Sequence, residues 1–194
     1  MNAAKHALAP FGVDLDLDTG VMANARNHSV RRASDMRGYY ADPAALETLI
    51  RQGDPIHYEV FELPVPEESG HLMYCISRLQ PGTVGAEYFM TKGHYHQSAG
   101  TAEIYLGLRG QGYLLMKTAG GQCHAEPLAR GHMAYVPPFW AHRSVNTGAE
   151  PLISFCVYPA NAGHNYGDIA TEGFPKRVFC RNGVVALESR EVPR

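Results

Sequence analysis

The sequence predicts an all-β protein, an antiparallel barrel or jelly roll, with an N-terminal extension and one short helix. From residue 54 onward, short apolar segments of strand length recur, and turns containing Gly or Pro separate them. One earlier stretch has the caps and spacing of a helix. The 194 residues suffice for a single domain, and no repeat or linker divides them. We expect an extension over residues 1–53, packed on a barrel over residues 54–194.

The beginning of the chain has few periodic signals. Residues 14–18 alternate Asp with Leu, which predicts an edge strand. Three arginines follow, Arg26, Arg31 and Arg32. We interpret this cluster as a solvated face or a subunit contact rather than as an anion site.

The helix is predicted from its ends. Asp42 is a good N-cap, Pro43 suits the first helical position, and Gly53 suits the residue after the end. The apolar face of this helix consists of Ala45, Leu46, Leu49 and Ile50. We expect it to pack on the barrel and to carry no chemistry.

The expected strands cover residues 56–61, 71–79, 86–90, 112–117, 123–128, 132–136, 142–146 and 152–158. Gly120 and Gly121 form a tight turn between two of them. Residues 161–168 are polar, Gly-rich and aromatic, which is typical of a loop at the mouth of a barrel. A last hairpin is expected to turn at residues 181–183.

Composition excludes several classes of partner. The formal net charge is −2, whereas binding to a nucleic acid phosphate backbone requires a basic face. No apolar run is long enough to span a membrane, and the N-terminus lacks the apolar core of an export signal. The four cysteines, Cys75, Cys123, Cys156 and Cys180, are widely spaced. We therefore expect reduced thiols and a cytoplasmic location.

The residues with the strongest chemical signal are two alternating histidines followed by a carboxylate. On a strand, His94 and His96 point to the same face, and so do Glu103 and Tyr105 on the next strand. The polar loop between the two pairs is expected to close a hairpin. Two imidazoles and a carboxylate form a partial shell for iron, manganese, nickel or zinc. Alternating histidines alone are also found as surface or barrel-lining residues.

A second motif lies one β-hairpin further along. Gly131, Pro137, His142 and Asn146 fall in register with the second of the two motifs that define cupins, and the first motif contains the His-x-His. Phe139 stands where that motif has a glycine, which leaves the turn type open. The sequence thus resembles a cupin, and His142 is the expected fourth ligand.

The combined pattern resembles the cupin-type phosphoglucose isomerases of archaea and some bacteria, over roughly residues 34–166. The resemblance implies a glycolytic and gluconeogenic isomerase that interconverts glucose 6-phosphate and fructose 6-phosphate. It implies one divalent metal ion per subunit, Fe²⁺ first and Mn²⁺, Ni²⁺ or Zn²⁺ as alternatives, and a homodimer. It maps metal ligation onto His94, His96, Glu103 and His142.

Substrate contacts are expected from two sources. The Thr91 hydroxyl and the Gly93 backbone N–H lie just before His94 and suit a phosphate, whereas Lys92 is expected on the opposite face of the strand. The resemblance adds Tyr58, Ser77, Tyr158 and Tyr166 as pocket residues, and places Tyr105 and His164 near the sugar. The expected catalytic residues are Glu103, His142 and Tyr105.

Three questions stay open at this point. Glu103 is either a metal ligand throughout or the base that carries the proton, because a nearby cation lowers the pKa of a carboxylate. The reaction proceeds either by proton transfer through an enediolate or by a hydride shift. The alternatives to an isomerase are a metal-dependent cupin dioxygenase and a non-catalytic sugar-binding cupin.

Overall fold

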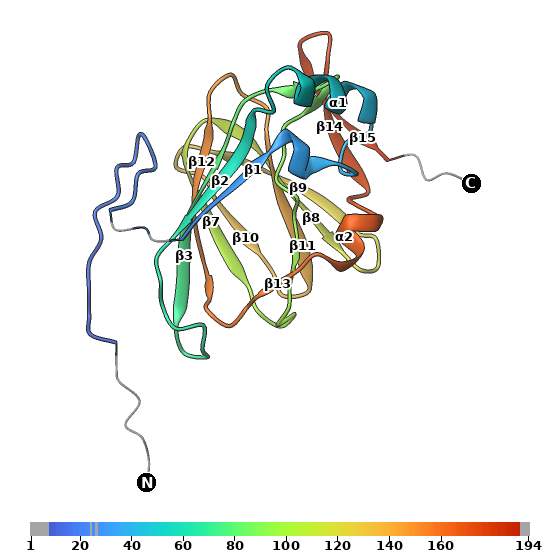
Figure 1. The fold of residues 1–194 in the computed structure, drawn as a ribbon. Coiled ribbons are helices and arrows are strands. Elements are labelled where there is room, and N and C mark those ends of the chain that lie inside the picture. The colour runs from blue at the N-terminus through green and yellow to red at the C-terminus, as the bar shows by residue number, and fades with distance from the viewer. Residues whose placement is uncertain (1–7, 24, 26, 191–194) are drawn as a thin grey trace.

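The computed structural model describes residues 8–23, 25 and 27–190. All strand pairs are antiparallel, and the strands wrap into a jelly-roll barrel (Figure 1). One wall is a six-stranded sheet in the order β1 (Asn27–Arg32), β2 (Ile56–Glu62), β3 (Leu72–Leu79), β12 (Leu152–Pro159), β7 (Glu103–Arg109) and β10 (Met133–Val136). The opposite wall is the sheet β11 (Trp140–Asn146), β8 (Gln111–Thr118) and β9 (Cys123–Ala129).

Two smaller sheets and three short helices complete the fold. The pair β13 (His164–Asn165) and β6 (Tyr95–His96) lies at one end of the barrel. A four-stranded sheet contains β15 (Val184–Ser189), β14 (Lys176–Arg181), β5 (Glu87–Tyr88) and β4 (Thr83–Val84). The helices are the 3-10 helix η1 (Ala33–Met36), α1 (Pro43–Arg51) and α2 (Gly167–Thr171). No helix in the described part of the chain is long and apolar enough to cross a membrane.

Most of the expected elements are confirmed. Asp42 caps α1 by accepting a 2.8 Å hydrogen bond from the backbone N–H of Ala45, and Pro43 is its first residue. The last hairpin joins β14 to β15 through Asn182 and Gly183, whose positive φ angles of 53° and 78° are those of a tight hairpin turn. The expected mouth loop contains β13 and leads into α2, which begins at Gly167.

Two expectations about the backbone are wrong. Residues 14–18 form no strand; Leu15 makes only an isolated bridge with Met22. Between them the Asp16 carboxylate accepts hydrogen bonds from two backbone N–H groups, so this segment is a turn. The histidine segment and β7 do not form a hairpin either, since β6 pairs with β13 while β7 pairs with β12 and β10.

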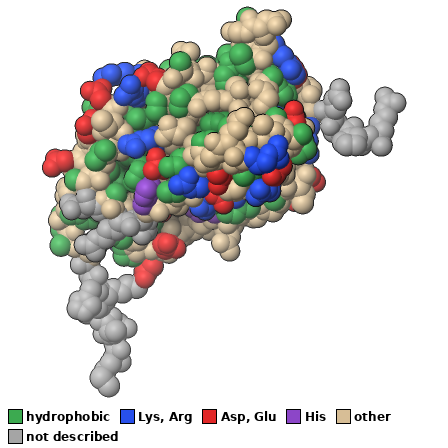
Figure 2. Space-filling view, turned by 45° about the horizontal axis from the view of Figure 1, so that its top comes forward, with side chains coloured by type: hydrophobic (Ala, Val, Ile, Leu, Met, Phe, Trp, Pro, Cys, Tyr) green, Lys and Arg blue, Asp and Glu red, His purple; other side chains and the backbone are tan. Residues whose placement is uncertain are grey.

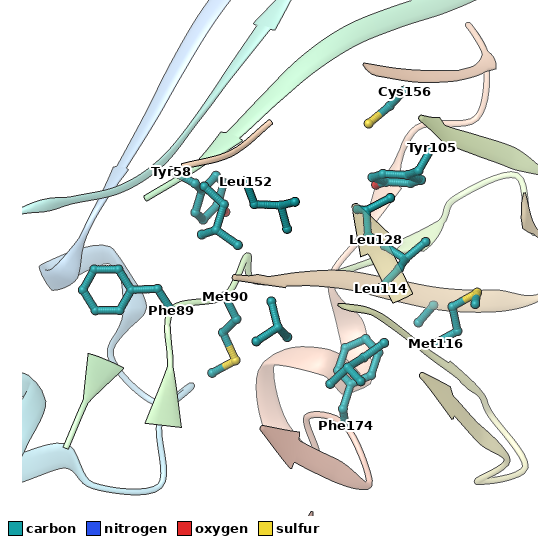
Figure 3. Close-up of a cluster of buried hydrophobic side chains, with 14 of the residues drawn as sticks. Tyr58, Phe89, Met90, Tyr105, Leu114, Met116, Leu128, Leu152, Cys156 and Phe174 are labelled. Carbon is teal, nitrogen blue, oxygen red and sulfur yellow. The ribbon is translucent and has the colours of Figure 1, made fainter. Parts of the chain in front are cut away.

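The N-terminal extension is part of the barrel wall. β1 pairs with β2 along its whole length and forms an edge of the six-stranded sheet. The preceding segment covers the outer face of that sheet, where Val13, Leu15 and Met22 pack against Ile76 and Ile153. Inside the barrel, a second and larger apolar cluster surrounds Leu114, Leu128 and Leu152 (Figure 3). The barrel is therefore packed on both faces of its larger sheet.

Phe139 adopts the backbone conformation that the cupin motif reserves for glycine. Its φ angle is 70°, and its backbone N–H donates a 2.8 Å hydrogen bond to the Ala99 carbonyl, which holds the turn in place. The Phe139 side chain is 66% exposed, so it gains little from burial. The turn keeps its shape at the cost of left-handed backbone strain.

We predict that Phe139→Gly is more stable than Phe139→Ala by about 1 kcal/mol, because only glycine relieves the left-handed strain. Both variants lose the same exposed ring, so the comparison isolates the effect of Cβ. Urea unfolding followed by circular dichroism measures the difference. Equal stabilities of the two variants would show that the turn carries no such strain.

A second prediction concerns His57, which is fully buried and stacks on Phe89 with ring centroids 3.8 Å apart. Burial lowers the pKa of His57 from 6.5 to about 4. As the pH falls from about 6.5 towards 4, the unfolded chain takes up a proton that the folded chain refuses, so stability is lost. Between pH 7 and pH 5 this loss amounts to about 2 kcal/mol. His57→Phe keeps the stacking and should show a stability decline smaller by that amount in urea titrations at both pH values.

Candidate metal centre and substrate pocket

Four side chains of metal-ligand type converge inside the barrel. They are His94 just before β6, His96 in β6, Glu103 at the start of β7 and His142 in β11. One ligand atom from each lies within 4.8 Å of the others. The Nε2 atoms of His96 and His142 lie 3.0 and 2.9 Å from the same oxygen of Glu103. The structure thus brings together all four of the ligands that the sequence predicts.

The backbone before His94 explains this convergence. His94 and His142 exchange two backbone hydrogen bonds, of 3.2 and 3.0 Å, which fix the first motif against the second. Gly93 has a φ angle of 77°, and a Cβ there would lie 2.9 Å from the His142 carbonyl oxygen. Only glycine permits this close approach. Gly93 therefore has a structural role in addition to the substrate contact that the sequence predicts.

Thr101 sets the tautomer of His96. The Thr101 hydroxyl donates a 2.6 Å hydrogen bond to the Ser98 carbonyl, so its oxygen is left to accept from His96 Nδ1, 2.8 Å away. A proton on Nδ1 leaves the lone pair of Nε2 directed at the centre of the cage. Such a partner behind a ligand histidine orients the ring and raises its basicity. The contact of Thr101 with His96 was not predicted from the sequence, although Thr101 lies in the spacer between His96 and Glu103.

Several buried acceptor atoms of the cage lack a hydrogen-bond donor, and a cation would satisfy them. His96 Nε2 and the Glu103 carboxylate are both acceptors, yet they face each other in a buried space. His142 is 1% exposed, and neither of its ring nitrogens has a hydrogen bond of good geometry. Buried polar atoms of this kind normally have a partner. Three imidazoles and one carboxylate are a suitable donor set for a divalent transition metal ion, so the residues present fit such an ion.

Electrostatics favour the ligating states of Glu103 and His94. Burial raises the pKa of the Glu103 carboxyl, but the surrounding histidines, His142 first, outweigh burial and hold it well below its usual range. Burial and the neighbouring His142 lower the pKa of His94. An ionised carboxylate and neutral imidazoles are the protonation states that bind metal ions.

The cage forms part of the wall of a cavity of about 270 Å³. Every residue predicted to contact substrate or to take part in catalysis lines this cavity, namely Tyr58, Ser77, Thr91, Gly93, Glu103, Tyr105, His142, Tyr158, His164 and Tyr166. His94 also lines it, whereas His96 does not. The ring of His164 is 4.3 Å from that of His94, because β13 pairs with β6.

Strand alternation explains which side chains enter the cavity. In β2, Tyr58 and Glu62 are four residues apart, so both side chains point to the same face of the strand and into the cavity. In β1, Ser29 and Arg31 do the same, and Arg31 lies opposite Tyr58. Glu62 accepts a 3.0 Å hydrogen bond from the hydroxyl of Tyr158. Ser29 and Glu62 could not be predicted from the sequence, because nothing local marks their strands as cavity walls.

Two cationic side chains lie in the cavity wall against expectation. Arg31 was interpreted as part of a solvated or subunit surface, but it lines the cavity, while Arg32 is exposed and Arg26 is outside the described residues. Lys92 was expected on the face opposite His94, yet it lines the same cavity. The expectation was wrong because residues two apart on an extended segment point to the same face, so Lys92 and His94 share a side as His94 and His96 do. Histidine and Lys or Arg side chains reach the molecular surface side by side (Figure 2).

The jelly roll and its two ligand motifs define a cupin. Solved structures that resemble it include oxalate oxidase bound to glycolate (16% identity, TM-score 0.48, 58% of this chain and 56% of that one). Another is the oxalate decarboxylase of Lactobacillus farciminis with formate (20% identity, TM-score 0.45, 56% and 30%).

Within this class, the model of the family "Glucose-6-phosphate isomerase (GPI)" matches residues 30–192. The glucose-6-phosphate isomerase of Thermococcus litoralis is 47% identical over 92% of this chain and 94% of its own. The isomerase of Pyrococcus abyssi is 48% identical over 92% and 94%. The chain belongs to the glucose-6-phosphate isomerase family.

We predict that Thr101→Val lowers metal affinity about 10-fold, because valine removes the closer of two acceptors for His96 Nδ1, the hydroxyl at 2.8 Å, and leaves only the backbone carbonyl of residue 101 at 3.2 Å. Thr101→Ser keeps the hydroxyl and serves as the matched control. Isothermal titration of the metal-free protein with Mn²⁺ measures the affinity, and circular dichroism checks the fold. A valine variant that binds Mn²⁺ as tightly as the serine variant would contradict this role.

Proposed function

We propose that this protein interconverts glucose 6-phosphate and fructose 6-phosphate and that it requires one divalent metal ion. The observation that carries the proposal is a four-ligand cage in the wall of a cavity that also holds two cationic side chains. A cavity of about 270 Å³ with many polar groups suits a small, hydroxyl-rich anion. An oxygen-using cupin would have no need of cations placed for a phosphate.

The metal ion would be held by His94, His96, Glu103 and His142. When bound, it would polarise the substrate carbonyl and stabilise the negative charge that develops on its oxygen. Fe²⁺, Mn²⁺, Ni²⁺ and Zn²⁺ all accept this donor set, and we place Fe²⁺ first on the family resemblance. All further groups in the cavity act on the substrate through binding, orientation and proton movement.

The phosphate would bind at the end of the cavity formed by β1 and the residues before His94. Arg31 and Lys92 supply the charge there, and burial together with the nearby Arg31 lowers the pKa of Lys92. Two cations at close range repel each other, and a dianion between them removes that repulsion. Thr91 and Tyr58 line the same cavity and offer hydroxyl groups. Charge-assisted hydrogen bonds from Arg and Lys are the strong contacts of such a site.

The sugar would lie between the phosphate end and Glu62. The Glu62 carboxylate and the Tyr158 hydroxyl already form a hydrogen-bonded pair in the cavity wall, which suits a row of sugar hydroxyls. Ser77 lies on the neighbouring strand β3 and faces the same space. These groups would orient the chain so that its first two carbons face the cage.

The surroundings of Glu103, His164 and Tyr105 indicate which of them would accept or donate a proton. Glu103 contacts two histidines and has a lowered pKa, which favours its role as ligand over that of base. Desolvation lowers the pKa of His164, so its imidazole is neutral near pH 7 and able to accept a proton at the cavity mouth. Burial raises the pKa of Tyr105 well above its usual value, so its hydroxyl stays protonated and can donate to a substrate oxygen.

We predict that the purified protein converts fructose 6-phosphate to glucose 6-phosphate, that a chelator abolishes this activity, and that added divalent metal restores it. His142→Ala should bind metal weakly and lose at least about 100-fold in kcat/KM, because it removes one of four ligands. A coupled assay with a panel of metals measures turnover, and elemental analysis measures metal content. Full turnover after complete metal removal would exclude the metal role.

We also predict that Arg31→Met raises KM about 10- to 100-fold with little change in kcat, because the lost contact with phosphate is a charge-assisted hydrogen bond. Arg32→Met is the matched control, since it removes the same charge from the opposite face of β1. Initial rates over a range of fructose 6-phosphate concentrations separate KM from kcat. Equal KM values in the two variants would remove Arg31 from the phosphate site.

A further inference from the structure

Two cysteines form a facing pair in the floor of the substrate cavity. Cys75 in β3 and Cys156 in β12 are direct partners across the antiparallel ladder. Both line the cavity, and they are 5% and 0% exposed. All four cysteines of the chain are free thiols. The sequence predicts two buried thiols but not that they face each other. That pairing depends on the register between β3 and β12, which are far apart in the sequence.

The pair belongs to one row that runs across the cavity floor. The row crosses four strands through Glu62, Cys75, Cys156 and Tyr105, each paired with the next. Figure 3 shows the Cys156 sulfur next to the ring of Tyr105. Glu103 is two residues before Tyr105 on the same strand, β7. A covalent change at the thiols therefore acts on the strand that carries a metal ligand and a catalytic tyrosine.

The register of the pair is one that a cross-strand disulfide requires. Facing residues of antiparallel strands have Cα atoms about 4.5 or 5.5 Å apart, depending on the type of pair. Disulfides form over Cα separations of about 4.4–6.8 Å. The other two cysteines have no such partner in the ladder, since Cys123 faces Lys117 and Cys180 faces Val185.

We propose that Cys75 and Cys156 are a dithiol site that hydrogen peroxide converts to a disulfide, and that this disulfide reversibly lowers turnover. The strand register and the cavity support the dithiol site. The effect of the disulfide on turnover rests on the proposed function. Peroxide is small enough to reach the floor through the substrate cavity. The hydrogen bond with Cys156 and burial raise the pKa of Cys75, which makes the reaction slow at neutral pH.

The chemistry balances in two steps. The sulfur of one cysteine, as thiolate, attacks a peroxide oxygen; the O–O bond breaks, and sulfenic acid and hydroxide form. The sulfur of the second cysteine then attacks the sulfenic sulfur, the S–O bond breaks, and water leaves. In total the two thiols lose two electrons and two protons, and one peroxide becomes two waters. A dithiol reductant reverses the change by thiol–disulfide exchange.

The expected effect follows from the short bond. A disulfide holds its sulfurs about 2.05 Å apart, closer than two thiols in contact, so the side chains of Cys75 and Cys156 must turn towards each other beside Tyr105. A misplacement of about 1 Å at reacting groups can cost about 100-fold in rate, and for a smaller shift at Tyr105 we expect about a tenfold loss of turnover. The loss should disappear after treatment with dithiothreitol.

The test treats the full chain, loaded with Mn²⁺ so that iron does not react with peroxide, with hydrogen peroxide and then with dithiothreitol. Peptide mapping without reduction should find Cys75 joined to Cys156 and a mass lower by two hydrogen atoms. Cys75→Ser and Cys156→Ser should not form the bond and should keep their own untreated activity. Cys123→Ser and Cys180→Ser are the matched controls and should respond to peroxide as the parent chain does.

The outcomes separate the two proposals. Oxidation of Cys123 or Cys180 without a bond between Cys75 and Cys156 would overturn the site. A bond that forms without loss of turnover would overturn its regulatory effect, and so would an equal loss in Cys75→Ser. A chain with no isomerase activity would refute the proposed function, while the peptide map would still decide the fate of the thiol pair.

Discussion

The contact on which the site depends is the meeting of two imidazole nitrogens with a single oxygen of Glu103, at 3.0 and 2.9 Å. A buried carboxylate is costly unless positive charge or hydrogen-bond donors surround it. His96 is held as an acceptor by Thr101, and His142 has no well-formed hydrogen bond, so neither side chain alone satisfies the carboxylate. A metal ion would satisfy all of these groups at once, which supports the metal dependence that we propose.

The cavity wall next to this contact contains both cationic and acidic side chains. Strand alternation in β1 and β2 places Arg31 at one end of the cavity and Glu62 at the other. The cage lines the same cavity, so a bound sugar phosphate would have its charge near Arg31 and its hydroxyls towards Glu62. This order of charges, together with membership in the glucose-6-phosphate isomerase family, supports an aldose–ketose isomerase over the other cupin activities.

Two residues with positive φ angles and a pair of facing cysteines lie close to the cage. Gly93 and Phe139 both have positive φ angles, and each holds a turn that brings a ligand-bearing segment to the cage. Next to the cage, Cys75 and Cys156 place two thiols opposite each other on the floor of the cavity. Strained turns and unusual buried groups cost stability, and proteins retain them mainly at functional sites.

By itself, the sequence determined most of the strands, the capped helix, the jelly-roll class and the four residues of the cage, because alternation and motif spacing are local properties of the chain. Only the tertiary structure decided that Arg31 enters the cavity, that Thr101 supports His96 and that Cys75 faces Cys156. The first and the last depend on strand pairing across long sequence separations, about which periodicity contains no information. The support from Thr101 depends on how a loop folds back, which spacing alone does not set.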